Sequence, residues 1–277
     1  MSPLPDPTAR ADGPGHTASG TPGAPGTPGP LTSLAGLPGA GDERPVTLDR
    51  RDGPYGEVVL RERGERLEII ANGCFLMDTS DGRSERLLVD AALAALTTPA
   101  AGGPPAPTPA PAAGRRPSVL IGGLGVGFSL AHAAADPRWG RIAVVEREEA
   151  VIDWHRNGPL ARISATALAD PRTVILHTDL VEYVRTATDS YDALCLDIDN
   201  GPDWTVTEGN ESLYSAEGLA ACRARLNPGG VLAVWSARPS PVFGEALRNA
   251  GFTGVKQEEV PVARGVPDVV HLAVRTA

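Results

Sequence analysis

The sequence predicts an α/β protein built on a doubly wound, mostly parallel sheet, with a small β-hairpin unit before it. Three observations lead to this prediction. From residue 118 onward short apolar runs alternate with amphipathic segments, a glycine-rich turn follows the first of these runs, and a hairpin pattern precedes residue 98. Such alternation is typical of strands joined by helices on both faces of a parallel sheet.

Proline and glycine divide the 277-residue chain into folded and unfolded parts. Residues 1–45 hold ten prolines and nine glycines, and residues 99–117 hold seven further prolines. Segments with so few large apolar side chains bury too little surface to offset the entropy of ordering. We therefore expect a disordered tail at 1–45, a hairpin unit at 46–98, a linker insertion at 99–117 and an α/β domain at 118–277. Shortening the insertion by eight residues is expected to leave folding unchanged.

The hairpin unit is read from alternating apolar residues and one strong turn signal. Three strands and a following amphipathic helix are expected at 55–62, 66–71, 74–78 and 84–96. Asn72 and Gly73 lie between the last two strands and favour a type I′ turn, which requires positive φ at both positions. The exposed edge of such a hairpin favours a homodimer.

The α/β domain is read from buried-strand runs and helix breakers. Its first run, SVLIG, is apolar until it ends in glycine, as a buried parallel strand is. Strands are expected at 118–122, 141–146, 173–177, 193–198, 231–236, 252–260 and 268–275, and helices at 127–135, 148–156, 180–187, 212–226 and 241–250. Asn157-Gly158-Pro159 ends the second of these helices, and 227–230 forms a turn before the fifth strand.

Composition excludes several classes of protein. The sequence contains neither an apolar run of about 20 residues nor a basic stretch followed by an apolar core at its N-terminus, so we expect no membrane span, no signal peptide and a cytoplasmic location. The net charge of −9 argues against nucleic-acid binding by a basic face. Three cysteines and five histidines at unrelated spacings indicate neither a disulfide framework nor a metal site.

One acidic stretch stands out. Between Arg185 and Arg223 the sequence has eight acidic residues and no basic one. A solvated acidic surface and a cleft that concentrates a cationic ligand both explain this pattern.

Candidate functional residues follow the predicted strands, where ligands bind in sheets of this kind. Gly123, Gly125 and Gly127 form a GxGxG turn that lets the backbone approach a ligand closely. Phe128 then departs from the GxGxxG pattern of dinucleotide binders, which argues against an oxidoreductase.

Acidic residues come after the next three strands. Glu146 is placed to accept hydrogen bonds from a ribose diol. Asp179 is the natural N-cap of the next helix, and it either caps that helix, contacts an adenosyl group, or does both. Asp197, Asp199 and Asn200 begin the acidic stretch, and acids at the end of a central strand are costly unless they are used. Together these residues describe an S-adenosylmethionine-type pocket.

The sequence resembles the spermidine synthase family, the polyamine aminopropyltransferases, whose fold is of the class I methyltransferase type. VLIGGLGVGF resembles the family's VLVIGGGDGG, VVERE its VEID, and YDALCLDIDNGP its YDVIIxDxxDP. LEIIANGCFLMDTSDGRSERLLVDAAL is similar to the segment that contains L-x-L-D-G-x-x-Q and D-E-x-x-Y-H-E. The resemblance covers about 55–260.

The resemblance implies a function and a role for each candidate residue. It implies aminopropyl transfer from decarboxylated S-adenosylmethionine to a small cationic amine, with Asp197 as the catalytic acid that orients and deprotonates the amine. The implied cofactor-binding residues are Gly123, Gly125, Gly127, Glu146, Asp179 and Leu180, and the implied substrate-binding residues are Tyr55, Asp90, Asp199, Asn200 and Tyr214.

The sequence departs from the family mainly where the amine is bound. Val126 replaces the Asp of GGGDGG that faces the aminopropyl group, Leu88 and Val89 replace the Tyr-His pair, and Asn200 replaces the second Asp of DxxDP. Leu76 and Gly56 stand at the positions of two glutamines. An S-adenosylmethionine-dependent small-molecule methyltransferase and a non-catalytic adenosyl-ligand-binding protein therefore remain alternatives.

Overall fold

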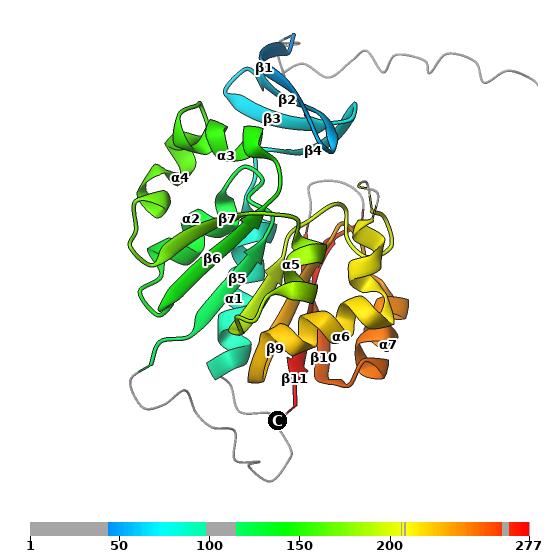
Figure 1. Ribbon diagram of the computed structural model, residues 1–277. Coiled ribbons are helices and arrows are strands. Elements are labelled where there is room, and N and C mark those ends of the chain that lie inside the picture. The colour runs from blue at the N-terminus through cyan, green and yellow to red at the C-terminus, as the bar shows by residue number, and fades with distance from the viewer. Residues whose placement is uncertain (1–43, 98–114, 206, 208, 262–265, 277) are drawn as a thin grey trace, which may run out of the picture. The chain divides into compact units, whose positions relative to one another are not determined.

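The computed structural model describes residues 44–97, 115–205, 207, 209–261 and 266–276. The predicted tail and most of the predicted linker insertion lie outside these residues. In the described part the chain forms two sheets with helices around the larger one, which confirms the predicted α/β class (Figure 1).

The smaller sheet contains four antiparallel strands in the order β1-β2-β3-β4. These strands are β1 (Val46–Gly53), β2 (Gly56–Arg63), β3 (Arg66–Ala71) and β4 (Cys74–Asp78). Asn72 and Gly73 have φ of 51° and 78°, as the predicted type I′ turn requires. Strand β1 was not predicted, because its sequence VTLDRRDG is polar and mostly exposed.

The small sheet is held to the rest of the fold by side chains of β1. Arg51 donates to Asp153 at 2.6 Å, and the Trp154 indole donates to Asp49 at 2.8 Å. Both partners lie on helix α3 (Glu149–Arg156). Residues 46–53 therefore position the small sheet over the larger domain.

The larger sheet has seven strands in the order β10-β11-β9-β8-β5-β6-β7. Its strands are β5 (Ser118–Gly122), β6 (Arg141–Glu146), β7 (Thr173–His177), β8 (Tyr191–Leu196), β9 (Leu226–Ser236), β10 (Phe252–Val260) and β11 (Asp268–Arg275). The pairs among β5 to β9 are parallel, whereas β11 pairs antiparallel with β9 and β10. The sheet is therefore mostly parallel, as predicted.

Helices cover both faces of the seven-stranded sheet (Figure 1). Side chains that alternate along the strands divide between two apolar clusters: Val119 and Ile121 pack with α1 (Arg83–Thr97) and α2 (Phe128–Ala135), and Leu120 packs on the opposite face. The helices on that opposite face are α5 (Leu180–Thr186), α6 (Ala216–Arg225) and α7 (Pro241–Asn249). This is the doubly wound arrangement.

Several elements differ from the prediction. The turn predicted at 227–230 is wrong: these residues belong to β9, which begins at Leu226 and pairs with β8 through a register shift between Tyr191 and Ala193. Helix α4 (Ala161–Leu168) was missed because its sequence ARISATAL has few large apolar residues, and it buries only Ser164 and Ala167. Strand β8 begins two residues earlier than expected because Tyr191 pairs with Leu226. The helix predicted for 212–226 is broken: a 3-10 turn (Asn210–Tyr214) precedes α6, whose N-cap Ser215 accepts from the Gly218 amide.

No helix in the described ranges is long and apolar enough to cross a membrane.

Candidate active site

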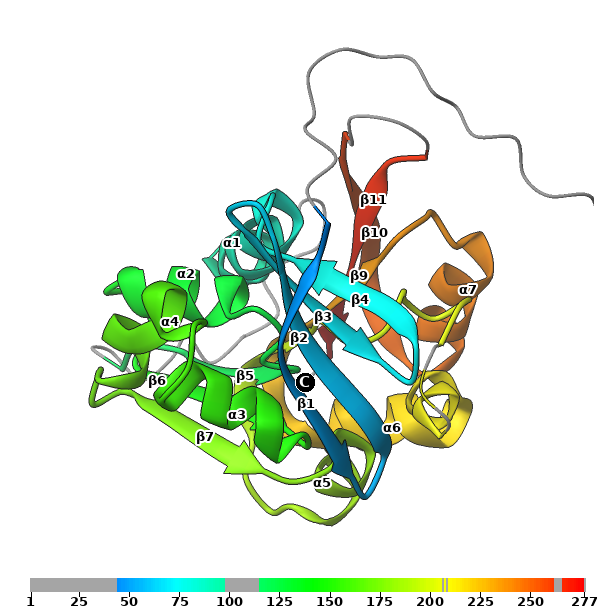
Figure 2. The ribbon, with the colours of Figure 1, turned by 90° about the horizontal axis from the view of Figure 1, so that it is seen from above.

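A cavity of about 650 Å³ lies at the carboxyl ends of the central parallel strands. Its walls come from the loops after β5, β6, β7 and β8, from the start of α1 and from strands β2, β3 and β4. Seen from above, the four-stranded sheet lies across these strand ends (Figure 2). The cavity is therefore enclosed between the two sheets, at the edge where the sequence predicted function.

The glycine loop after β5 forms one wall and requires glycine at two positions. Gly123 and Gly125 line the cavity with φ of 92° and 49°, which side-chain-bearing residues rarely adopt. A Cβ at Gly123 would lie 2.5 Å from the Asp197 carbonyl oxygen, and a Cβ at Gly125 2.4 Å from the Met77 sulfur. The loop backbone is therefore pressed against both β4 and the end of β8.

Gly127, the third predicted glycine, faces away from the cavity. It is the N-cap of α2, and its Cα lies against His155. The buried His155 ring binds the Gly125 carbonyl oxygen through Nε2 at 2.9 Å and the Ser164 hydroxyl through Nδ1 at 2.7 Å. Burial lowers the pKa of His155, so the neutral imidazole supports the loop.

Glu146 ends β6 and lies at the cavity with only 8% of its surface exposed. Its two carboxylate oxygens accept from the Leu124 and Glu148 amides at 2.9 and 2.8 Å. Burial raises the pKa of this carboxyl above its ordinary value, and the backbone amides oppose that rise. The Arg147 amide also contributes a hydrogen bond, so the carboxylate keeps at least one acceptor site for a ribose hydroxyl.

Asp179 and Leu180 follow β7 and also line the cavity. The Asp179 carboxylate caps α5 by accepting from the Glu182 amide at 2.9 Å. Its second oxygen has no hydrogen bond to the described residues, so capping leaves one oxygen for a ligand. Leu180 packs so closely on Gly122 that a Cβ there would approach its Cδ2 to 2.6 Å.

Asp197 follows β8 and lies deep in the cavity, although its side chain keeps some exposure. Its amide donates to the Gly122 carbonyl at 2.9 Å, and its Oδ2 accepts from the Ser129 hydroxyl at 3.0 Å. Burial raises the pKa of Asp197, the charge of Asp268 raises it further, and the Ser129 hydrogen bond opposes both. A carboxylate with a raised pKa is a stronger base than an ordinary aspartate.

Two further acidic residues beside Asp197 were not predicted. Glu85, in the first turn of α1, has a pKa raised by burial and then by the charge of Asp197. Asp268, at the start of β11, lines the same cavity and accepts from the Ser84 hydroxyl at 2.6 Å. Glu85 stands at the first Glu of the D-E-x-x-Y-H-E segment that the sequence resembles, but no role was assigned to it, because an acid in the first turn of a helix is ordinary.

Asp199 and Asn200 line the cavity. The Asp199 carboxylate is hydrogen-bonded to residues of its own loop. Its carboxylate accepts from the Thr207 amide at 3.2 Å and from the Asn210 side-chain amide at 2.7 Å. Asn200 pairs through its backbone carbonyl with the Ala237 amide. These contacts hold the acidic loop in place.

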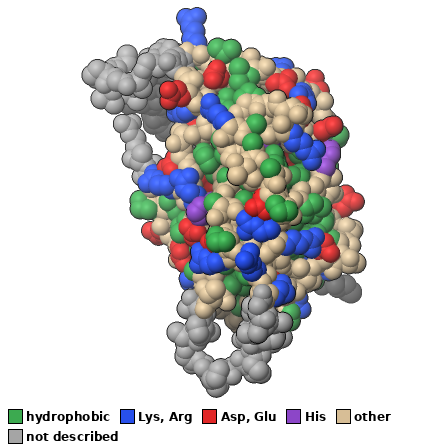
Figure 3. Space-filling model, turned by 90° about the vertical axis from the view of Figure 1, so that its left-hand side faces the viewer, with side chains coloured by type: hydrophobic (Ala, Val, Ile, Leu, Met, Phe, Trp, Pro, Cys, Tyr) green, Lys and Arg blue, Asp and Glu red, His purple; other side chains and the backbone are tan. Residues whose placement is uncertain are grey.

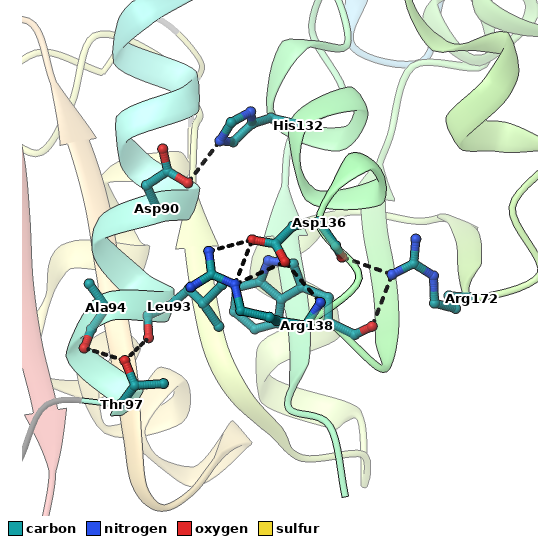
Figure 4. A network of polar contacts seen from close by, with 9 residues as sticks. Asp90, Leu93, Ala94, Thr97, His132, Asp136, Arg138 and Arg172 are labelled. Carbon is teal, nitrogen blue, oxygen red and sulfur yellow. Dashed lines mark hydrogen bonds and ion pairs between the residues drawn. The ribbon is translucent and has the colours of Figure 1, made fainter.

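The structure places three predicted substrate-binding residues outside the lining of the cavity. Tyr55 lies on the small sheet, where the Arg147 guanidinium stacks 4.3 Å from its ring centroid. Asp90 binds His132 at 2.8 Å between α1 and α2 (Figure 4). Tyr214 packs edge-on against Phe243 within the cluster beneath α6 and α7.

The residues at which the sequence departs from the spermidine synthase pattern fall into two groups, those buried in the core and those that line the cavity. Val126 is fully buried in the apolar core, as are Leu88 and Val89. Leu76 instead faces the cavity from β4. At these positions the chain has replaced polar groups by apolar packing or by an apolar cavity wall.

A second, open depression lies at the opposite ends of the parallel strands and is lined by Arg115, Arg116, Arg141 and Arg172. Arg115, Arg141 and Arg172 each form an ion pair with an aspartate. Figure 3 shows arginine and acidic side chains on one face of the molecule, with arginines gathered in its lower half. The pairing gives these arginines a structural role.

Among the described residues no group of His, Cys, Asp and Glu is arranged to hold a metal ion.

The described part of the chain is an α/β protein with a cavity at the carboxyl ends of its parallel strands. No family model matches the chain. Its fold is that of the spermidine synthases. It superimposes on spermidine synthase from Thermotoga maritima with a TM-score of 0.61 and 17% identity, covering 83% of this chain and 72% of that one. A spermidine synthase in complex with the transition state analogue AdoDATO gives a TM-score of 0.64 at 19% identity, covering 83% of this chain and 73% of that one.

Sequence similarity extends over part of the chain. It is 30% identical over 127 residues to polyamine aminopropyltransferase 1 of Streptomyces coelicolor. The matched stretch is 46% of this chain and 23% of that relative, so the chain spans about a quarter of the relative's length. The predicted resemblance is therefore confirmed in the fold and, for this stretch, in the sequence.

Proposed function

We propose that the protein transfers an aminopropyl group from decarboxylated S-adenosylmethionine to an amine. The placement of Asp197 carries the proposal: one continuous cavity joins this carboxylate to the glycine loop, Glu146 and Asp179. The names of the sequence relative and of the neighbour with AdoDATO support the same chemistry.

The residues of the first wall fit an adenosyl ligand. Gly123 and Gly125 expose backbone at the cavity, Glu146 keeps at least one acceptor site, and Asp179 keeps one free oxygen. The co-substrate supplies a sulfonium that makes the adjacent carbon of its aminopropyl group electrophilic. The protein's task is to hold that carbon and a neutral amine in line, and such alignment is worth about 7–11 kcal/mol.

Asp197 is the proton acceptor of the proposed reaction. The ammonium first passes one proton to the Asp197 carboxylate. The neutral nitrogen then forms a bond to the carbon as the carbon–sulfur bond breaks, methylthioadenosine leaves, and the product is a secondary ammonium. A simple alkylamine has a pKa of about 10.4, so it must lose a proton before it attacks. Because burial raises the pKa of Asp197, the carboxylate is better matched to this transfer near neutral pH.

One observation favours methyl transfer from S-adenosylmethionine as a second candidate. Val126 is buried in the core where the spermidine synthase family has an aspartate facing the aminopropyl group. The cavity therefore lacks that recognition element for the decarboxylated co-substrate.

The products separate these candidates. The full chain is incubated with an amine and either co-substrate, and the nucleoside products are resolved by chromatography. We expect methylthioadenosine from the decarboxylated form. Formation of S-adenosylhomocysteine instead would establish methyl transfer, and absence of both products despite calorimetric binding of the adenosyl ligand would identify a non-catalytic binding protein. The cavity's position beside the small sheet is compatible with a homodimer, which sedimentation of the same sample tests.

A further inference from the structure

We propose that Tyr55 and Arg147 form a stacked wall against which the planar base of the adenosyl ligand lies, and that Tyr55 is a positioning residue for Arg147. This inference rests on the proposed function, and within it only on the binding of an adenosyl ligand in the cavity, which both candidate transfers require. It differs from the acceptor-binding role that the resemblance implied for Tyr55, because it places the effect of that residue at the proposed adenosyl end.

Arg147 lies at the strand ends that carry the two acids proposed for the adenosyl ligand. It directly follows Glu146 at the end of β6, it lines the cavity, and its side chain is only 19% exposed. Its backbone carbonyl oxygen accepts from the His177 Nε2 at 3.1 Å. His177 ends β7, two residues before Asp179. The Arg147 backbone is therefore fixed beside both strand ends.

Neighbours among the described residues occupy one face and two nitrogens of the Arg147 guanidinium. Its Cζ lies 4.3 Å from the centroid of the Tyr55 ring, Nη2 donates to the Thr207 hydroxyl at 3.3 Å, and Nε pairs with the Glu148 carboxylate at 3.4 Å. Tyr55 lies outside the lining of the cavity whereas Arg147 belongs to it, so the ring covers the face of the guanidinium that is turned away from the cavity. The opposite face is turned toward the cavity.

A flat cationic face of this kind suits a planar, electron-rich ring. Guanidinium planes stack on aromatic side chains and on nucleobases, and the purine is the planar group of an adenosyl ligand. An anionic group is disfavoured at the same place, since Glu148 already pairs with the guanidinium and Glu146 adds a second carboxylate beside it. Arg147 therefore offers the ligand a stacking surface rather than a counter-charge.

The small sheet holds Tyr55 against the guanidinium. Tyr55 lies in the two-residue turn between β1 and β2, where its carbonyl oxygen accepts from the Asn72 side-chain amide at 3.1 Å, and the Asn72 Oδ1 accepts from the Glu57 amide at 2.9 Å. A Cβ at Gly53 would lie 3.5 Å from the Glu148 carboxylate, so the turn packs directly on the loop that follows β6. A free arginine side chain adopts many rotamers, and the fixed ring restricts this one to the stacked arrangement.

The test measures the affinity of methylthioadenosine for the full chain by calorimetry. Arg147→Met keeps an unbranched side chain but removes the guanidinium plane, and Arg147→Lys keeps the charge without the plane. We expect either variant to raise the dissociation constant about tenfold, within the range of base stacking on a side chain. Tyr55→Leu should raise it several-fold, and Tyr55→Phe, which keeps the ring, should stay within about twofold. Unchanged affinity in both Arg147 variants would overturn the inference.

A double variant shows whether Tyr55 acts through Arg147. If Tyr55 works only by positioning the guanidinium, Tyr55→Leu combined with Arg147→Met binds methylthioadenosine no more weakly than Arg147→Met alone. Losses that multiply would instead mean that Tyr55 contributes independently, and they would overturn its assignment as a positioning residue. Arg86→Met is the matched control and should stay within about twofold, because the Arg86 guanidinium lies 5.8 Å from the Phe128 ring, outside the cavity lining. Unchanged thermal unfolding shows that each variant folds.

Turnover separates failure of the inference from failure of the proposed function. Base stacking acts equally in the ground state and the transition state, so Arg147→Lys is expected to raise KM for decarboxylated S-adenosylmethionine about tenfold with kcat nearly unchanged. If the unaltered protein releases no methylthioadenosine from that co-substrate while the binding order of the variants holds, the proposed function fails and the inference stands. If methylthioadenosine does not bind the unaltered protein, both fail.

Discussion

The two ends of the cavity are built in different ways. At the proposed adenosyl end the acids Glu146 and Asp179 are fixed by backbone amides at strand ends and at a helix start. At the proposed amine end, around Asp197, the lining includes side chains from the first turn of α1 and the start of β11, among them Glu85 and Asp268. Backbone-held groups persist as long as the fold does, whereas side-chain walls change with each substitution. We therefore expect substitutions to alter the proposed amine end more readily than the proposed adenosyl end.

The largest expected effect separates chemistry from adenosyl binding. Asp197→Asn removes the proton acceptor but keeps the Ser129 hydrogen bond possible, so we expect turnover to fall by about 10²–10⁴-fold. Calorimetry should show the adenosyl ligand binding within about twofold of the unaltered protein, because the backbone contacts of the other end are intact. Asp203→Asn, outside the cavity lining, is the control and should leave both measurements unchanged. Loss of both turnover and adenosyl-ligand affinity would indicate that Asp197 has a structural role. It would contradict the separation of catalysis from adenosyl binding.

The complementary change addresses the adenosyl end. Glu146→Gln exchanges one acceptor oxygen for a donor that faces a backbone amide, and it removes the charge offered to the ribose hydroxyls. We expect the dissociation constant of the adenosyl ligand to rise about tenfold to a hundredfold, in line with hydrogen bonds to charged groups. Calorimetry measures this, with the exposed neighbour Glu149→Gln as control. Equal affinities of the Glu146 and Glu149 variants would contradict the assigned role.

A smaller effect tests how the glycine loop touches the small sheet. Gly125→Ala introduces a Cβ that meets the Met77 sulfur at 2.4 Å, at a residue whose φ of 49° is itself unfavourable for alanine. We expect the free energy of unfolding to fall by about 1–3 kcal/mol, measured by denaturant titration. Gly73→Ala, also at positive φ but with open space around it, isolates the backbone contribution. A loss no larger than that of Gly73→Ala would show that the glycine loop and β4 are not pressed together.

The smallest effect concerns the pH dependence of stability. Because burial and Asp197 raise the pKa of Glu85 above its ordinary 4.5, the folded protein binds more protons there than the unfolded chain. The stabilisation is present below the ordinary value and is lost as the pH rises through the raised one. Glu85→Gln should therefore melt at the same temperature as the unaltered protein in acid and a few degrees higher in mild alkali.

The control for this prediction is an acid in an equivalent helical position. Glu217 lies exposed in the first turn of α6, so Glu217→Gln should show no such pH-dependent difference. A difference between the Glu85 variant and the unaltered protein that stays constant with pH would contradict the prediction.

Much of the fold was predictable because buried strands have continuous apolar sequences. Strands 118–122, 141–146 and 268–275, which are mostly buried, were predicted with the bounds that the structure shows. Strand β1 and helix α4 were not, since a polar edge strand and a helix of small residues carry little periodicity. Their position is decided by contacts such as Arg51 with Asp153, which join residues far apart in the sequence.

The same reasoning explains which candidate site residues meet at the cavity. Glu146, Asp179 and Asp197 meet there because each follows a strand, and the carboxyl ends of parallel strands share one edge. Tyr214 and Asp90 were named from the resemblance alone, and the structure turns them toward neighbouring helices. Glu85 matches the Glu of D-E-x-x-Y-H-E in the sequence, but its approach to Asp197 depends on how α1 docks against the large sheet.

The His155 imidazole connects helix α4 to the glycine loop through two hydrogen bonds, one to Ser164 and one to the Gly125 carbonyl. A carbonyl oxygen only accepts, so Nε2 must carry the hydrogen that reaches Gly125, and Nδ1 must then accept from the Ser164 hydroxyl. These two hydrogen-bond partners determine the tautomer of His155. The planar ring therefore holds a fixed distance between Ser164 and the Gly125 carbonyl. A displacement of α4 would consequently move a carbonyl of the glycine loop that lines the cavity, although the described lining includes no residue of that helix.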